Sequence, residues 1–182
     1  MPPTQSESVV LDGARFTLDA LEAVSLRGAA VSVAGAARDA VVRARRVVDE
    51  AVARGAIVYG VTTGFGNFAD VHIKADRLRD LQLNLVRSHA AGVGEPLGEA
   101  DTRALMVLRA NVLAKGFSGI RPETLDLLVA LINHRVHPII PAQGSVGASG
   151  DLAPLAHLAL ALVGEGEAVH EGRRQPSGEA LR

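Results

Sequence analysis

Apolar residues recur at the three- and four-residue spacing of amphipathic helices over most of the chain. On this basis helices are predicted over residues 38–54, 76–89, 101–115, 121–136 and 151–163. Gly55, Gly116 and Gly164 directly follow three of these stretches, as helix-ending glycines do, and Pro122 lies in the first turn of another. The pattern therefore predicts a mainly α protein.

Strand-like patterns are scarce by comparison. Residues 56–61, AIVYGV, form one β-branched run that suits a short strand or an extended entry into a loop. We expect at most one or two short strands in the chain. Residues 1–14 are expected to be flexible or extended, residues 15–165 to form the helical core, and residues 166–182 to form a polar, loop-like tail.

The last three predicted helices are rich in Leu, Val and Ala on more than one face. Helices that are apolar nearly all round are buried by further protein. The remaining segments of this chain offer few candidates to cover them. We therefore expect more protein against these helices, either additional chain or other subunits.

Composition narrows the classes of partner. The chain is 48% hydrophobic and 21% charged, which suffices for a core. Its 19 Lys and Arg against 20 Asp and Glu give a net charge of −1, so neither nucleic acid nor an anionic membrane is an expected partner.

The absence of Cys excludes disulfides and Cys nucleophiles and fits a cytoplasmic location. No secretory signal is evident, and the longest apolar run, residues 152–163, is shorter than the roughly 20 residues of a membrane helix.

The candidate chemistry centres on GSVGASGDLAPLAH, residues 144–157. If a rigid fold compresses this loop, the unhindered nitrogen of Gly150 can attack the carbonyl carbon of Ala148. Loss of water from that ring and from the Ser149 side chain leaves a methylidene electrophile. Asp151, at a helix start, suits the helix dipole and can carry a proton locally. From the tripeptide alone, a plain Gly/Ser loop leading into an Asp-capped helix is the favoured interpretation, because Ala-Ser-Gly is a common string.

The stretch resembles the signature of the aromatic amino acid ammonia-lyases, which build a 4-methylideneimidazole-5-one (MIO) group from Ala-Ser-Gly. Further segments resemble the same family in the same order along the chain: residues 58–68 (VYGVTTGFGNF), 81–97, 103–121 and 131–152. The likeness covers most of residues 15–182. It implies the N-terminal helical part of an ammonia-lyase fold, with Gly-rich active-site loops and an MIO loop at 142–151.

The resemblance also implies roles for individual residues. Ala148, Ser149 and Gly150 would form the MIO group autocatalytically, supported by Asp151. Tyr59 would serve in acid/base chemistry or in departure of the leaving group. Outside the family context, Tyr59 is also consistent with a half-buried aromatic residue that ends a short strand.

Gly66, together with Gly64, would let the loop after Tyr59 fold over substrate. Neither a Walker spacing nor a following Lys-Ser/Thr pair supports a phosphate-binding loop there.

Ser88 and His89 bear on the choice of substrate. The histidine-acting members of the family carry a Ser-His pair here, whose His contacts the substrate imidazole, whereas tyrosine-selective members tend to have a bulky apolar residue after the His. Ala90 follows His89 in this chain. The resemblance thus implies a carbon–nitrogen lyase of histidine degradation that converts L-histidine to trans-urocanate and ammonia. Outside the family context, the favoured interpretation of His89 is a helix-end histidine that faces the C-terminal dipole.

Two other functional classes stay open. One is a tyrosine or phenylalanine ammonia-lyase, or an aminomutase, of the same family. The other is a non-catalytic helical module that associates with a partner chain, which the apolar helices would suit.

The remaining histidines are assigned no chemistry. His134 and His137 have a spacing that permits a metal pair, but no carboxylate lies near them in the sequence to complete a site. We expect neither a metal nor a nucleotide. His157 is expected to be a satisfied core histidine, and His72 and His170 to lie on the surface.

The chain is much shorter than the several hundred residues of the family's enzymes. Further active-site residues of the family lie beyond this length, and its active sites combine subunits of a tetramer. We therefore expect residues 1–182 to be the N-terminal portion of a larger, cytoplasmic, homotetrameric lyase, inactive as an isolated chain.

Overall fold

Helices dominate the computed structural model, which describes residues 8–64, 73, 75–145 and 152–182. The helices are α1 (Leu18–Ser25), α2 (Gly35–Ala53), α3 (Leu78–His89), α4 (Glu99–Ala114), α5 (Pro122–Asn133), α6 (Leu152–Leu162) and α7 (Ser177–Ala180), with a 3₁₀ turn at Ala75–Arg77. The mainly α class is confirmed. The five helices predicted from apolar periodicity correspond to α2–α6, and α1 and α7 were not predicted.

Short strands are more numerous than expected. Within the described residues they are β1 (Ser8–Leu11), β2 (Ala30–Val33), β3 (Val93–Pro96), β4 (His137–Pro138), β5 (Pro141–Gln143), β6 (Glu167–His170) and β7 (Arg173–Pro176). They form three small sheets in the orders β1-β2, β3-β5 and β4-β6-β7. The expectation of at most one or two strands was wrong because strands of two to four residues are too short to show an alternating pattern. Residues 56–61, the candidate strand, form an irregular turn instead.

The tail expected to be loop-like is a β-hairpin. Strands β6 and β7 pair antiparallel, with Ala168 opposite Gln175 and Val169 opposite Arg174. Glu171 and Gly172 join them with positive φ angles of 51° and 73°, the conformation of the tight turns that match strand twist. The hairpin packs through Ala168, which is fully buried. At the other end of the chain, β1 pairs parallel with β2.

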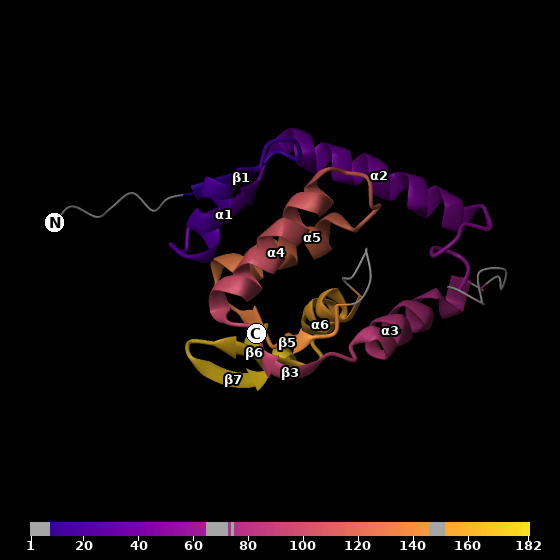
Figure 1. The fold of residues 1–182 in the computed structure, drawn as a ribbon. Coiled ribbons are helices and arrows are strands. Elements are labelled where there is room, and N and C mark those ends of the chain that lie inside the picture. Colours follow the sequence, from indigo (N-terminus) through magenta and orange to yellow (C-terminus); the bar gives the residue numbers. More distant parts are fainter. Residues whose placement is uncertain (1–7, 65–72, 74, 146–151) are drawn as a thin grey trace.

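The core lies among α1, α2, α4 and α5. Figure 1 shows α4 and α5 side by side near the centre of the molecule, with the long α2 across them, and α2 contacts both helices. Large side chains with almost no exposure fill this region: Leu11, Val24, Val41, Met106, Val107, Leu125, Leu128, Ile132 and Ile140. Each Å² of apolar surface that these side chains remove from water contributes roughly 25 cal/mol to the free energy of folding. This burial is the main force that stabilises the arrangement.

One cation is buried within that core. Arg103 of α4 is 2% exposed, and its Nε donates to the carbonyl oxygen of Val24 at 2.8 Å, while Nη1 donates to that of Ile132 at 3.0 Å. These carbonyls lie in the last turns of α1 and α5, where the helix dipole favours positive charge. Burial lowers the pKa of Arg103 below its ordinary value. The side chain thus satisfies two helix ends from inside the core.

His137 lies next to this cation. Its Nε2 is 3.4 Å from Nη1 of Arg103 and 3.7 Å from Oε1 of Glu99. Burial is the main cause that lowers the pKa of His137. The described residues contain no group of three His, Cys, Asp or Glu side chains that could hold a metal ion.

Helices α3 and α6 form a second packed unit beside the core. They contact each other, α6 contacts α5, and β3 pairs with β5 at one end of the unit. Within the described residues, no helix combines the length and apolar character that crossing a membrane requires. This second unit carries Ser88 and His89, for which the sequence predicted a role in binding substrate.

Candidate active site

The predicted site residues fall into two groups. Gly66, Ala148, Ser149, Gly150 and Asp151 lie outside the described residues. Tyr59, Ser88 and His89 lie within them, as do the residues up to Ser145 before the tripeptide and from Leu152 after it. The site can therefore be built from its flanks and from the end of α3.

A close contact of four residues joins those flanks, and we call Gly92, Gly144, Ala153 and His157 the glycine junction. A Cβ at Gly144 would lie 2.8 Å from Cβ of Ala153 and 3.1 Å from Cα of Gly92. A Cβ at Gly92 would lie 3.1 Å from Nε2 of His157. A side chain at Gly144 would force its neighbours to shift, and one at Gly92 would make contacts tighter than ordinary van der Waals distances. The chain therefore enters and leaves the tripeptide segment at the same place.

The segment before the tripeptide is also fixed by strand pairing. β3 and β5 run antiparallel with Val93 opposite Gln143 and Pro96 opposite Pro141, and the register shifts between these pairs. The Leu97 N–H donates to the Ile140 carbonyl at 2.8 Å. Because β3 follows α3 after a short turn, this pairing brings the end of α3 next to the start of the tripeptide segment.

Ser88 and His89 occupy the last turn of α3. His89 is half-buried, and its Nδ1 lies 2.9 Å from the Leu85 carbonyl oxygen and 3.0 Å from Oγ of Ser88. The Ser88 hydroxyl donates to the same carbonyl at 2.8 Å. Since a carbonyl only accepts, the neutral ring carries its proton on Nδ1 and presents Nε2 as an acceptor. The helix-end placement expected for His89 is confirmed.

An ion pair joins α3 to Glu165, which follows α6. Arg87 Nε and Nη2 donate to the two carboxylate oxygens of Glu165 at 2.9 and 2.5 Å. This hydrogen-bonded pair lowers the pKa of Glu165 and raises that of Arg87. Both side chains are partly exposed, so the pair fixes geometry more than it adds stability.

Tyr59 lies on a separate turn between α2 and α3. It is 63% exposed and does not end a strand, so the half-buried alternative was wrong. The turn is built on two buried threonines: Thr62 Oγ1 accepts from the Val58 N–H at 2.9 Å, and Thr63 Oγ1 from the Gly60 N–H at 3.3 Å. The contacts above join His89, rather than Tyr59, to the flanks of the tripeptide. The role expected of Tyr59 stays a prediction.

His157 is the residue whose position the sequence did not reveal. Its Nε2 accepts the Gly92 N–H at 3.1 Å, so the expectation of a satisfied histidine is confirmed, although the ring is only half-buried. Burial lowers the pKa of His157. Its spacing of four residues from Ala153 places both on one helix face, which was visible in the sequence. The contacts of His157 with Gly92 and of Ala153 with Gly144 were not visible in the sequence.

An apolar groove between α4 and α6 agrees with the expected exposure of apolar helix faces. It is lined by Asp101, Ala104, Leu105, Leu108, Arg109, Val112, Pro154 and Leu155. Leu108 and Val112 are 43% and 47% exposed, and Leu152 at the start of α6 is 66% exposed. Such contiguous apolar surface typically marks an interaction site.

Comparison with known proteins gives consistent relatives. The family described as "Aromatic amino acid lyase" matches residues 16–182. Histidine ammonia-lyase of Geobacillus sp. (strain WCH70) is 52% identical over 173 residues, which cover 95% of this chain and 34% of the relative. The solved histidine ammonia-lyase of Trypanosoma cruzi superposes with a TM-score of 0.86 at 41% identity, covering 96% of this chain and 34% of that one.

An aminomutase is similar as well. The tyrosine aminomutase of Streptomyces globisporus has a TM-score of 0.88 at 36% identity, with 96% of this chain and 32% of that chain covered. The chain thus spans about a third of the length of its curated relatives, with 34% covered in the Geobacillus enzyme. Since the family match extends over nearly all of the sequence, the chain belongs to the aromatic amino acid lyase family.

Proposed function

We propose that this chain forms part of an ammonia-lyase that eliminates ammonia from L-histidine to give trans-urocanate. The observation that carries the proposal is the Ser88–His89 pair at the end of α3, tied through the glycine junction to both flanks of Ala148–Gly150. The histidine ammonia-lyases among its relatives, such as that of Geobacillus at 52% identity, support the same substrate.

The residues around the tripeptide fit an MIO group. Ring closure between Gly150 and Ala148 needs a loop whose ends are held together, and Gly144 and Ala153 approach too closely for any added side chain. Ala148, Ser149 and Gly150 would form the group, with Asp151 as a local proton carrier. Such a group supplies an electrophile that makes the substrate amine a better leaving group.

His89 would bind the imidazole of the substrate. With Nδ1 on the Leu85 carbonyl, Nε2 of the neutral ring can accept the imidazole N–H of histidine. Phenylalanine lacks a side-chain donor, and the phenol of tyrosine places its donor on a longer side chain. The tautomer therefore favours histidine over these two amino acids.

Tyr59 and Gly66 would complete this part of the site. The Tyr59 hydroxyl is proposed to move a proton during loss of ammonia, and Gly66 to let the intervening loop approach substrate. Neither metal nor nucleotide is part of the proposal.

The complete enzyme is proposed to be a cytoplasmic homotetramer, in which further protein covers the groove between α4 and α6. Because the relatives are about three times as long, with 34% of the Geobacillus enzyme matched, we expect the isolated chain to be inactive.

Two alternatives have support of their own. The likeness to tyrosine aminomutase, with a TM-score of 0.88, favours isomerisation of an aromatic amino acid by the same kind of site. The exposed groove favours a non-catalytic module whose role is to associate with another chain.

The first experiment is the intact mass of the purified chain. A deficit of two waters in the peptide that holds Ala148–Gly150, abolished by Ser149→Ala, supports MIO formation in this chain. The full unmodified mass, together with strong association, supports the non-catalytic module for the isolated chain.

The substrate is tested in a chimera in which residues 1–182 replace the matching third of the Geobacillus histidine ammonia-lyase. We expect urocanate from histidine and loss of that turnover in His89→Ala. His134→Ala, which alters an exposed histidine at the end of α5, serves as the matched control. Unchanged histidine turnover in His89→Ala would contradict the proposal, and a β-amino acid product would favour the aminomutase.

A further inference from the structure

We propose that His157 is a positioning residue that fixes the Ser88–His89 end of α3 relative to Gly144 and Ala153, on either side of the tripeptide, by accepting the N–H of Gly92. The structural part of this proposal stands on the contacts alone. Its consequence for substrate binding rests on the function proposed above.

The turn after α3 makes Gly92 a sensitive point of attachment. The Ala90 N–H donates to the Val86 carbonyl at 3.1 Å, and the Ala91 N–H donates to that of His89 at 2.8 Å. These hydrogen bonds fix the short path from His89 to Gly92. Any displacement of the Gly92 backbone is therefore passed to the last turn of α3.

The contact requires an acceptor on a flat side chain. Nε2 of His157 accepts the Gly92 N–H at 3.1 Å. A Cβ at Gly92 would lie 3.1 Å from Nε2 and 3.3 Å from Cδ2 of the same ring. The imidazole thus lies directly against the backbone of Gly92.

The neutral form of the ring is the one that can make this bond. A charged imidazole has no acceptor, so Nε2 accepts only when the ring is neutral and its proton is on Nδ1. Burial lowers the pKa of His157, which favours the neutral ring.

One face of α6 holds both parts of the site. Ala153, one helical turn before His157, packs against Gly144, while His157 binds Gly92. A rotation of α6 would therefore move the start of the tripeptide segment and the end of α3 together. The ion pair of Arg87 with Glu165, which lies beyond the end of α6, is partly exposed and would hold this register less tightly.

The structural test measures hydrogen exchange of the Gly92 amide in the 182-residue chain. His157→Leu, which keeps the volume without the acceptor, should speed this exchange by about fivefold or more. His157→Gln, whose amide oxygen can accept, should restore protection, and His134→Leu should leave it unchanged. Equal protection in the wild-type chain and His157→Leu would overturn the proposal.

A measurement on the wild-type chain covers the case in which His157→Leu does not fold. The ¹⁵N chemical shifts of the His157 ring at neutral pH should report a proton on Nδ1 and none on Nε2. A proton found on Nε2 would overturn the proposal without any variant.

The functional test uses the chimera described above. His157→Leu should raise KM for histidine by about tenfold while kcat, normalised to the fraction of chains with the two-water deficit, changes less. His157→Gln should rescue KM. If the chimera does not act on histidine, the proposed function fails while the exchange result still decides the positioning role. If KM stays unchanged when Gly92 exchanges faster, the role in substrate binding is overturned.

Discussion

Arg103 illustrates how a single polar residue organises apolar surroundings. Its guanidinium is buried in the core, yet two carbonyl oxygens and the ring of His137 lie within 3.4 Å. An uncompensated buried charge is costly, so these acceptors are what permits the charge to remain there. Of these two carbonyls, that of Ile132 also accepts the Arg135 N–H at 3.3 Å.

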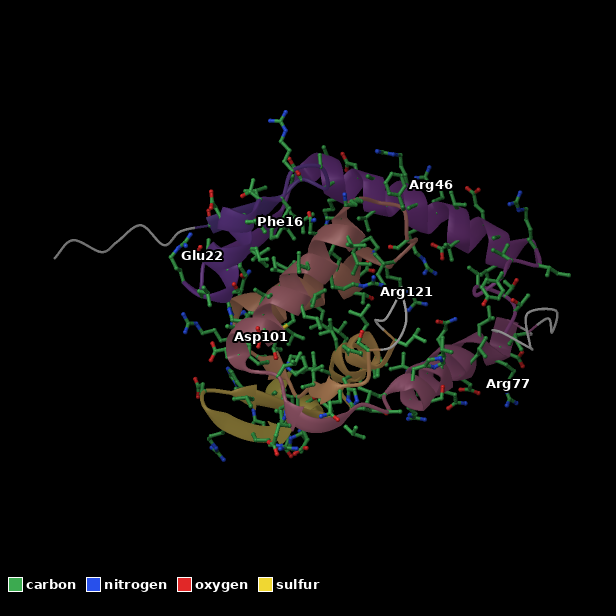
Figure 2. The ribbon with its side chains drawn as sticks, viewed as in Figure 1. Phe16, Glu22, Arg46, Arg77, Asp101 and Arg121 are labelled. Carbon is green, nitrogen blue, oxygen red and sulfur yellow. The ribbon has the colours of Figure 1, made fainter. Side chains whose placement is uncertain are left out.

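We expect Arg103→Met to lower the free energy of unfolding by about 2–4 kcal/mol, since it leaves the carbonyls of Val24 and Ile132 without this donor. Chemical denaturation measures the change. Arg46→Met, at a side chain that points outward from α2 (Figure 2), should stay within about 0.5 kcal/mol. Equal effects of the two substitutions would show that the buried hydrogen bonds of Arg103 do not contribute to the free energy of unfolding.

The glycine junction gives a second prediction at this scale. Gly144→Ala should destabilise the chain by about 1–3 kcal/mol, because its Cβ would lie 2.8 Å from that of Ala153. Gly35→Ala, at the first position of α2, meets nothing within 4 Å and should be neutral or stabilise by up to about 1 kcal/mol. Thermal melting of both variants checks the pair, and a tolerated Gly144→Ala would refute the close packing.

The site residues differ in how far the sequence could locate them. Ser88 and His89 were predicted from a local motif, and their bonds to Leu85 follow from helical spacing. The bond between Gly92 and His157 joins residues 65 positions apart, and nothing local marks such a pair. Sequence patterns report neighbours along one element, whereas this contact exists only after two elements pack together.

Elements were predictable where their pattern is long. The helices α2–α6 carry repeated apolar faces over 11 to 19 residues, and several end at glycines. Helix α1 has only eight residues, and the strands have two to four, so neither displays enough of its period. The hairpin of β6 and β7 depends on the positive φ angles of its turn, for which Glu171 gave no signal.

Short elements depend correspondingly on local caps. The Thr17 hydroxyl oxygen accepts from the Ala20 N–H at 3.1 Å and caps α1. Thr17→Ala should lower the free energy of unfolding by about 1 kcal/mol. Thr17→Ser keeps the hydroxyl and should therefore lose much less stability than Thr17→Ala. Denaturant titration of both variants tests this, and equal loss in both would assign the effect to the threonine methyl group instead.

At the scale of the molecule, two histidines link stability to pH. Burial lowers the pKa values of His137 and His157 from the ordinary 6.5. As pH falls, the unfolded chain takes up these protons before the folded chain does. Their contribution to stability is therefore fully present above pH 6.5 and is lost as the pH drops through the lowered values.

Unfolding free energies measured below pH 6.5 should therefore decrease with acidity. His157→Gln should reduce the slope of the unfolding free energy against pH, and His134→Gln should leave this slope unchanged. Glu165 and Glu167, whose ion pairs lower their pKa values below the ordinary 4.5, titrate at lower pH and do not obscure this window. An unfolding free energy that stays constant between pH 6.5 and pH 4.5 would contradict the assignment of this dependence to the two histidines.

The groove between α4 and α6 makes a prediction about association. We expect the purified chain to self-associate as its concentration rises, because the groove leaves apolar side chains in water. Leu108→Glu should shift sedimentation toward the monomer. Val47→Glu, at a 65% exposed position on α2, is the control for added charge alone. A chain that stays monomeric at high concentration would exclude this surface as a site of self-association.

The glycine junction also has a consequence for the order of events in folding. Its contacts close a loop of 65 residues, whereas α4 and α5 meet across a short connection. Contacts between distant parts of the chain form late because closing a large loop is entropically costly. We expect the packing of α4 against α5 to appear in the folding transition state, and the contact between Gly92 and His157 only afterwards. Substitutions at Gly144 should then accelerate unfolding and leave the folding rate nearly unchanged. The two ends of the tripeptide segment would then be brought next to the end of α3 only after α4 and α5 have packed.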